Sequence, residues 1–196
     1  MRAVVGFAPH SGWTAAVVVG AHAREPRVLH RGRIELAEDA LQGSRQPYHW
    51  VEGRSLPQAE RELDRFLARA KAMALEGVRS LVAEAVRQGH ELTTAGILAS
   101  SGRKGGSLGA ILKSHALIHS ADGDHFRDAL EDGCVRAHLD VVRVPLRELD
   151  GLAAKALGLT GEAIQSRVKE LGRSVGAPWT RDEKTSCLLG WYLLAT

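Results

Sequence analysis

The sequence predicts an α/β fold in which helices cover both faces of a five-stranded mixed sheet. The first observation is the opening segment 2–36, which has the pattern of three short strands joined by tight turns. The second is a pair of later apolar runs, 78–86 and 139–145, which are predicted as the fourth and fifth strands. The third is the helical spacing of apolar residues in most of the remaining chain. This order places an antiparallel meander first.

The opening meander is predicted from its apolar pattern and its turn residues. Segments 3–7 and 14–19 are short apolar runs, typical of strands buried on both faces. Segment 27–36 instead alternates apolar and charged residues, which is typical of an edge strand with one solvated face. Gly and Pro in segments 9–12 and 20–26 supply the two turns.

The long connection 37–54 contains turn residues throughout and the aromatic run Tyr48, His49 and Trp50. Long loops inside compact domains are commonly functional or disordered, and three ring side chains in a row argue against disorder. Two interpretations stay open. The connection is either a ligand or partner loop with Arg45 and His49 as its polar groups, or a loop that folds its rings back over the sheet edge.

The remaining elements follow from helical periodicity and capping residues. A first helix is predicted from Ser55 to Gly77, and the strand 78–86 after it carries Glu84 near its end. Segment 87–106 is polar and rich in glycine. Capping residues at Thr160, and at Thr180 with Glu183, mark two later helix starts. The predicted later helices are 107–121, a second one to 138 after a break at Asp122-Gly123, 146–157, 161–173 and a last one from 180.

Length and composition indicate an ordinary globular protein, predicted as a single domain over residues 1–196. Lys and Arg exceed Asp and Glu by only 26 − 23 = 3, so net charge alone is weak evidence for nucleic acid. No apolar run reaches the roughly 20 residues that a membrane span needs, and no signal-peptide pattern opens the chain. Cys134 and Cys187 fall at apolar positions of helical patterns, as buried reduced thiols do. We therefore expect a cytoplasmic protein without a membrane partner.

The predicted order of elements resembles the ribonuclease H-like superfamily, and within it RuvC-type Holliday-junction resolvases. Four local matches carry the resemblance, which covers most of the chain. GFAPHSGWTAAVV at 6–18 is similar to the opening strand and turn, and LVAEAV at 81–86 to the fourth strand. Segment 155–171 is similar to the region before the last helix, and RDEKTSCLLGWYLL at 181–194 to that helix.

The resemblance implies a metal-dependent nuclease whose carboxylates are incomplete here. Those nucleases hold two Mg²⁺ ions with three or four carboxylates. The first-strand aspartate falls on Ala8, the fourth-strand glutamate on Glu84, and the two acids of the last helix on Asp182 and Thr185. Two of the four positions therefore lack a carboxylate, which predicts a pseudo-nuclease without metal or cofactor.

Other side chains suggest different chemistry. His115 and His119 have the i, i+4 spacing that allows two imidazoles to share a metal, with Glu84 as a third ligand; the alternative is that both lie between core and solvent. The basic, glycine-rich segment SSGRKGGS at 100–107 places Arg103 and Lys104 before a helix, as in an anion site or a flexible loop.

We accordingly predict a non-catalytic binding domain for nucleic acid or another phosphate-bearing ligand. Two alternatives remain: a metal-dependent hydrolase with a remodelled His/Glu site, and an assembly protein that forms a homodimer or larger homo-oligomer. The catalytic candidates are Glu84, Asp182, His115 and His119. The ligand-binding candidates are His10, Ser11, Arg45, His49, Arg103 and Lys104.

Overall fold

The five strands of the protein are β1 (Arg2–His10), β2 (Trp13–His22), β3 (Glu25–Glu35), β4 (Glu91–Ala99) and β5 (Asp140–Pro145). They form one sheet in the order β3-β2-β1-β4-β5, in a computed structural model that describes residues 1–22, 25–100 and 106–196. Neighbours in the meander β1-β2-β3 are antiparallel, whereas β1-β4 and β4-β5 are parallel. The predicted mixed sheet is therefore confirmed, with β3 at its edge.

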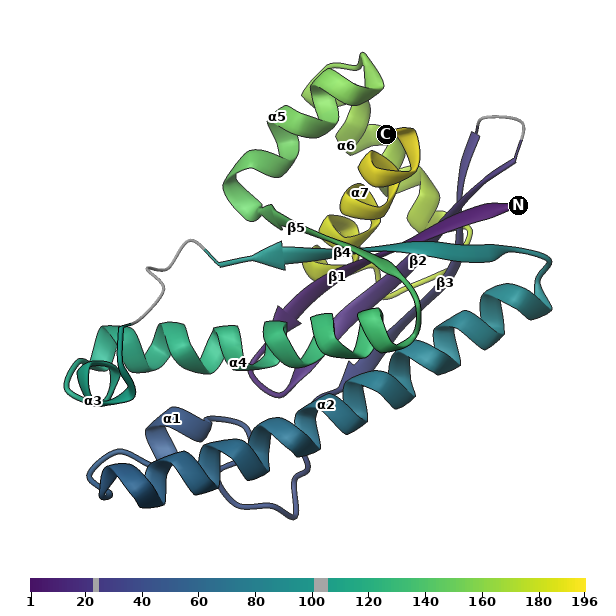
Figure 1. The fold of residues 1–196 in the computed structure, drawn as a ribbon. Helices are drawn as coiled ribbons and strands as arrows, with labels where there is room; N and C mark the ends of the chain where they lie inside the picture. Colours follow the sequence, from purple (N-terminus) through teal and green to yellow (C-terminus); the bar gives the residue numbers. More distant parts are fainter. Residues whose placement is uncertain (23–24, 101–105) are drawn as a thin grey trace.

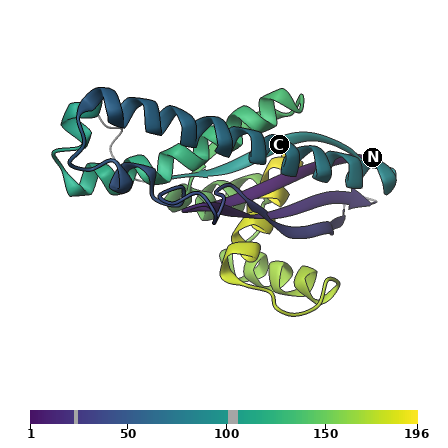
Figure 2. The ribbon, with the colours of Figure 1, turned by 90° about the horizontal axis from the view of Figure 1, so that it is seen from below.

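Helices cover both faces of this sheet in three layers (Figures 1 and 2). The helices are α1 (Pro47–Trp50), α2 (Leu56–Arg87), α3 (Leu108–Ile111), α4 (His115–Arg136), α5 (Leu146–Leu157), α6 (Gly161–Arg173) and α7 (Arg181–Ala195). The long helices α2 and α4 lie side by side on one face, and α5, α6 and α7 lie on the other (Figure 2). α1 and α3 lie beyond the end of the sheet, beside the first turns of α2 and α4 (Figure 1).

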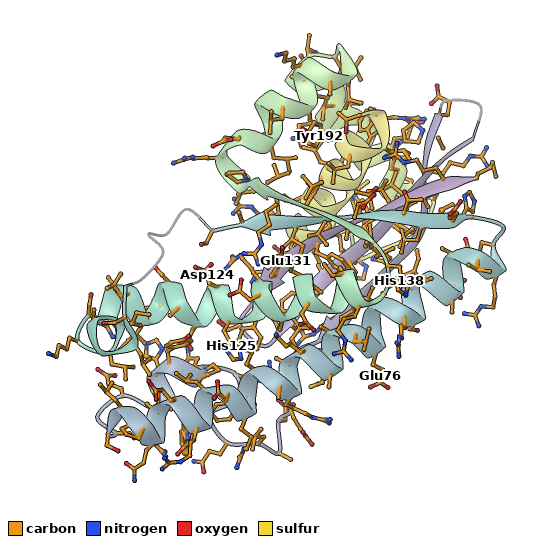
Figure 3. The ribbon with its side chains drawn as sticks, viewed as in Figure 1. Glu76, Asp124, His125, Glu131, His138 and Tyr192 are labelled. Atoms are coloured by element: carbon orange, nitrogen blue, oxygen red, sulfur yellow. The ribbon has the colours of Figure 1, made fainter. Side chains whose placement is uncertain are left out.

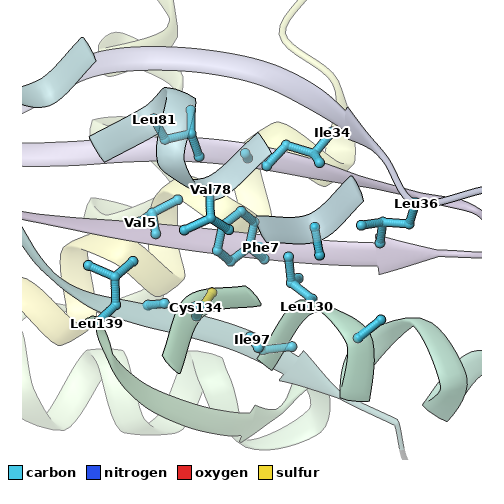
Figure 4. Packing of buried hydrophobic residues seen from close by; sticks show 14 of the residues in the cluster. Val5, Phe7, Ile34, Leu36, Val78, Leu81, Ile97, Leu130, Cys134 and Leu139 are labelled. Atoms are coloured by element: carbon cyan, nitrogen blue, oxygen red, sulfur yellow. The ribbon is translucent and has the colours of Figure 1, made fainter. Parts of the chain in front are cut away.

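Each face of the sheet has its own apolar core, because residues of a buried strand point alternately to opposite sides. Val5 and Phe7 of β1 pack against α2 and α4, where Val78, Leu130 and Cys134 are also buried (Figure 4). Val4 and Ala8 point the other way, into a cluster with residues of α5, α6 and α7. β1 is thus central to both cores, as its apolar run predicts.

The predicted strand at 78–86 is wrong, because these residues continue α2, which is 32 residues long. Val78, Leu81 and Ala85 are buried at helical spacing, and a short apolar run cannot distinguish a strand from a helix. Gly77 does not end the helix. A Cβ on Gly77 would lie 2.4 Å from Cγ2 of Ile34 in β3, so this glycine allows close contact between helix and sheet. The fourth strand is instead β4, within the segment predicted as polar loop.

The predicted helix break at Asp122-Gly123 is also wrong, because α4 continues through both residues. Asp122 is 3% exposed, so it is a buried part of the helix. Further along the chain the predictions are confirmed: α5 and α6 have the expected bounds, and the side chain of Thr160 caps α6. Thr180 and Glu183 form the predicted capping box of α7.

The two cysteines are free and buried, as predicted. Burial raises the pKa of Cys134 and of Cys187 to about 12, so both thiols stay protonated near neutral pH. Among the described residues, we find no helix whose length and hydrophobicity would let it cross a membrane.

Candidate functional site

The end of the sheet where β1 and β4 finish is the place at which the resemblance predicts two metal ions. Ala8, near the end of β1, is 5% exposed and pairs across the sheet with Ala15 of β2. Both methyl groups belong to the apolar cluster beneath α7, together with Leu188. A methyl group in apolar surroundings cannot ligate a hard dication, which needs oxygen ligands. The centre of the expected metal site is therefore a piece of hydrophobic core.

Close contact between α7 and β1 fixes the geometry at this end of the sheet. A Cβ on Gly6 would lie 2.0 Å from the carbonyl oxygen of Ser186, so only glycine permits α7 to lie this near the strand. The first turn of α7 then places Asp182 beside the end of β1. Its Oδ2 lies 3.1 Å from Nε2 of His10, with the two side chains 34% and 42% exposed. Two of the predicted site residues, His10 and Asp182, are thus brought together.

An aromatic and cationic stack extends from this pair across β2 to β3. The ring of His10 stacks on Trp13, with centroids 4.4 Å apart and planes inclined by 10°. The guanidinium carbon of Arg33 lies 4.2 Å from the centroid of the same tryptophan. Rings and guanidinium groups in this arrangement are also the groups on which nucleic-acid bases stack.

The resemblance also expects a carboxylate at the position of Thr185 and at the end of the fourth strand. Neither place holds an acidic residue. Thr185, in place of the second acid of the last helix, donates its hydroxyl hydrogen to the carbonyl of Arg181 at 2.9 Å. β4 ends at Ala99, and Ser100 after it donates a hydrogen bond to Oδ1 of Asp124 at 3.0 Å. Asp124 projects from α4 (Figure 3) and also lies 3.8 Å from Arg127. Of the two acids that the resemblance predicted, Asp182 is the one that lies at this end of the sheet, in the first turn of α7.

The placement of Glu84 on the fourth strand was wrong, and the residue lies elsewhere. It stands near the end of α2, where the chain turns into the start of β4, so it is at the opposite end of the sheet from Ala8. Hydrogen bonds from Gln88 and Arg87 lower the pKa of Glu84. A carboxylate in this position cannot share a metal ion with Asp182.

A pocket opens beside the start of α7, between this helix, α5 and α6. Its volume is about 220 Å³. Arg181 and Lys184 are exposed at its rim, and within the described part of the chain neither forms an ion pair. The amino end of a helix also carries partial positive charge, which favours anions. The lining residues are Leu146, Leu149, Asp150, Gln165, Val168, Arg181, Lys184, Thr185 and Leu188.

Ser11 and Arg45 line a second pocket, formed by the first turn and segment 39–46, with a volume of about 480 Å³. Arg45 donates to Oδ1 of Asp39 through Nη2 at 2.6 Å and through Nε at 2.9 Å. The guanidinium of Arg45, which the sequence predicts to face a ligand, is therefore paired with the carboxylate of Asp39. The other basic candidates, Arg103 and Lys104, lie outside the described residues.

Three histidines from two distant segments meet at the end of the molecule where α1 lies beside the first turns of α4. His49 comes from the aromatic run in α1, and His115 and His119 come from the first two turns of α4. One ring nitrogen of each lies within 4.8 Å of the others. The aromatic run thus packs back on the helices, and it also delivers one of the predicted ligand-binding residues to the predicted His115–His119 pair.

Asp122 joins this group, and the sequence interpretation missed it. Its Oδ2 lies 2.5 Å from Nδ1 of His49, and its Oδ1 accepts the backbone N–H of Tyr48 at 2.7 Å. Burial raises the pKa of Asp122, and hydrogen bonds from His49 and Tyr48 oppose that shift. His115, His119 and Asp122 are spaced i, i+4 and i+7, which places them on one helix face. That spacing was a usable signal, but the Asp-Gly pair was interpreted as a helix break.

Comparison with solved structures shows which known proteins have a similar fold. No protein-family model matches the sequence, and a search of curated proteins also finds no match. A solved structure of Thermus thermophilus RuvC in complex with Holliday junction substrate is similar, with a TM-score of 0.56 and 11% identity over 98% of this chain and 92% of that chain. A second T. thermophilus RuvC structure has a TM-score of 0.53 and 13% identity over 97% and 92%.

The chain therefore has a ribonuclease H-like fold, as its predicted order of elements indicated. Within that fold the two structures compared above are RuvC structures, matched over nearly the whole of both chains. At 11–13% identity the similarity concerns the fold alone.

Proposed function

We propose that the protein is a nucleic-acid-binding domain that uses a RuvC-like fold without two-metal nuclease chemistry. The observation that carries the second half of this proposal is Ala8, a buried methyl group where the resemblance requires the central carboxylate. Of the four carboxylate positions that the resemblance implies, only Asp182 presents a carboxylate at this end of the sheet within the described residues, so that set is incomplete for two Mg²⁺ ions. Similarity over 98% of the chain to a structure of RuvC with its junction substrate supports the first half.

The surface beside α7 supplies groups of the right kind for a phosphate backbone. Arg181 and Lys184 present two cations at a helix amino end, and Trp13 of β2 with Arg33 of β3 presents rings and a guanidinium nearby. Phosphate contacts by such residues bind nucleic acid without reading its sequence. The preferred form of nucleic acid is then an outcome of the binding experiment.

The experiment is a fluorescence anisotropy titration of labelled duplex, four-way junction and single-stranded DNA at several salt concentrations. We expect binding at about 50 mM salt that weakens steeply towards about 200 mM, because phosphate contacts release counterions. The Arg181→Gln/Lys184→Gln double variant should reduce the slope of log K against log salt by about 2, one unit for each lost contact.

The matched control is Arg61→Gln/Arg79→Gln, which removes the same charge from exposed positions of α2, on the other face of the sheet (Figure 2). This variant should keep the slope of the unaltered protein. Absence of binding to all three DNA forms at about 50 mM salt would contradict the proposal, since phosphate-driven affinity must appear there. Cleavage of any of them with added Mg²⁺ would contradict the absence of two-metal chemistry.

A further inference from the structure

The three-histidine cluster is made by elements that the nucleic-acid proposal does not use. His115 and His119 stand one turn apart on α4 with exposed side chains, and the half-buried His49 faces them from α1. The ring centroid of His49 lies 5.4 Å from that of His115 and 4.5 Å from that of His119. His49 and His119 are 119 − 49 = 70 residues apart in the sequence. Their contact therefore depends on the tertiary fold.

Asp122 contacts Nδ1 of His49 and so favours the tautomer in which Nε2 is free to bind a ligand. Its carboxylate is 3% exposed and accepts the Nδ1 hydrogen of His49 at 2.5 Å. A neutral imidazole that donates through Nδ1 keeps a free lone pair on Nε2. In metalloproteins a carboxylate commonly orients a ligating histidine in this way. The backbone N–H of Tyr48 donates to the same carboxylate at 2.7 Å. Two neighbouring residues of α1 therefore contact Asp122.

Hydrogen bonding between the histidines does not account for the whole cluster. Nε2 of His119 and Nε2 of His115 are 3.0 Å apart, which uses one hydrogen and one lone pair. The third imidazole adds another acceptor to the same small space. Nitrogen ligands of a tetrahedral zinc ion stand roughly 3.3 Å apart, as bond lengths of about 2.0 Å require. Nitrogens already within 4.8 Å therefore reach that arrangement by small side-chain rotations.

We propose that His49, His115 and His119 bind one divalent transition-metal ion of the zinc class, with Asp122 as the residue that positions His49. Three imidazoles suit Zn²⁺, Cu²⁺ or Ni²⁺ and do not suit Mg²⁺, which prefers oxygen ligands. Three protein ligands also leave a fourth coordination position for water or another small ligand. The ion links α1 to α4, so it fixes the aromatic run on the helical end of the molecule.

The test begins with untagged protein, stripped with a chelator and dialysed, and titrated calorimetrically with ZnCl₂ and, separately, MgCl₂. We expect one zinc ion per chain and no competition from millimolar Mg²⁺. Co²⁺ should give the visible absorption bands of a tetrahedral complex. At a zinc concentration 100 times the dissociation constant, the melting temperature should rise by about 5–10 °C, because the ion binds the folded state alone.

Variants then assign the ligands. His115→Gln and His119→Gln alter exposed side chains, so folding is preserved, and each should weaken zinc binding by about 100-fold or more; Asp122→Asn should weaken it by roughly 10–100-fold, as loss of an orienting partner does. His138→Asn removes an exposed histidine at the other end of α4 and should leave zinc binding unchanged (Figure 3). The proposal is wrong if the stripped protein binds no stoichiometric zinc, or if both glutamine variants bind it as tightly as the unaltered chain.

Discussion

Asp182 Oδ2 lies 3.1 Å from Nε2 of His10, so the acid at the start of α7 pairs with a base from β1. In the metal site that the resemblance implies, Asp182 would face a carboxylate from β1, with a metal ion between the two. Ala8, two residues before His10, occupies that place with its methyl group in the core beneath α7. The pairing of Asp182 is therefore compatible with the loss of the metal site, because the remaining charge has another partner.

Restoring the carboxylate should damage the fold. We expect Ala8→Asp to lower the free energy of unfolding by about 3–5 kcal/mol near neutral pH, since it places an unpaired charge in an apolar site that is 5% exposed. Urea unfolding monitored by circular dichroism measures the change. Ala8→Ser, which adds a single hydroxyl, is the control and should cost less. An Ala8→Asp protein of unaltered stability that gained Mg²⁺-dependent nuclease activity would instead mean that the metal site needs one substitution to recover.

A pair of glycine substitutions tests the contact between α2 and the sheet. Gly→Ala inside an exposed helix ordinarily stabilises a protein by up to about 1 kcal/mol. Gly151, in the middle of α5, has open space around its missing Cβ, so Gly151→Ala should follow this rule. Gly77→Ala places a Cβ 2.4 Å from Ile34 Cγ2, and overpacking of this kind costs about 1–3 kcal/mol. The two variants should therefore change the urea midpoint in opposite directions; a stabilising Gly77→Ala would show that the helix can move away from Ile34.

The same glycine shows why sequence patterns gave the class of fold and misplaced one strand. The meander, the edge position of β3 and the helices after β5 followed from alternation, Gly/Pro turns and capping residues, which are local signals. Gly77 was interpreted as a helix end, because the contact that requires a glycine there involves Ile34 on a strand far away in the chain. β4 was missed because Thr93, Thr94 and Gly96 dilute its apolar pattern, although its central residues are fully buried.

The candidate sites divide in the same way. His115 and His119 share a helix, so their spacing predicted that they lie together, and the structure agrees. His49 and Asp122 reach the same point through a chain reversal that no local pattern encodes. Glu84 was matched by sequence to a strand end and lies on a helix at the other end of the sheet. Residues brought together by tertiary contacts therefore had to be seen in the structure.

His125 provides a pH test of the packing between α2 and α4. The side chain, labelled in Figure 3, is 5% exposed, and burial lowers its pKa from 6.5 to about 4. The groups that face it are the carboxylate of Asp128, which opposes the shift, the backbone of Phe66 in α2, which also opposes it, and the ring of Tyr48 in α1. Asp124 and Arg143 line the pocket beside it. The folded protein therefore holds this imidazole neutral at pH values where the unfolded chain is protonated.

The sign of the effect on stability follows from proton uptake. Below the ordinary pKa of about 6.5 the unfolded chain binds a proton at His125 that the folded chain does not bind, so stability falls as pH falls until the folded-state pKa near 4 is reached. Between pH 7 and pH 5 this single group should remove about 2 kcal/mol. The measurement is urea unfolding at both pH values with a chelator present, which keeps metal binding out of the comparison.

His125→Gln should reduce the difference in unfolding free energy between pH 7 and pH 5 by about that amount, whatever it does to stability at pH 7. His138→Asn, at an exposed position just after the same helix, should leave the difference as it is. An equal pH dependence in the unaltered protein and in His125→Gln would mean that the imidazole takes up its proton in the folded state as well.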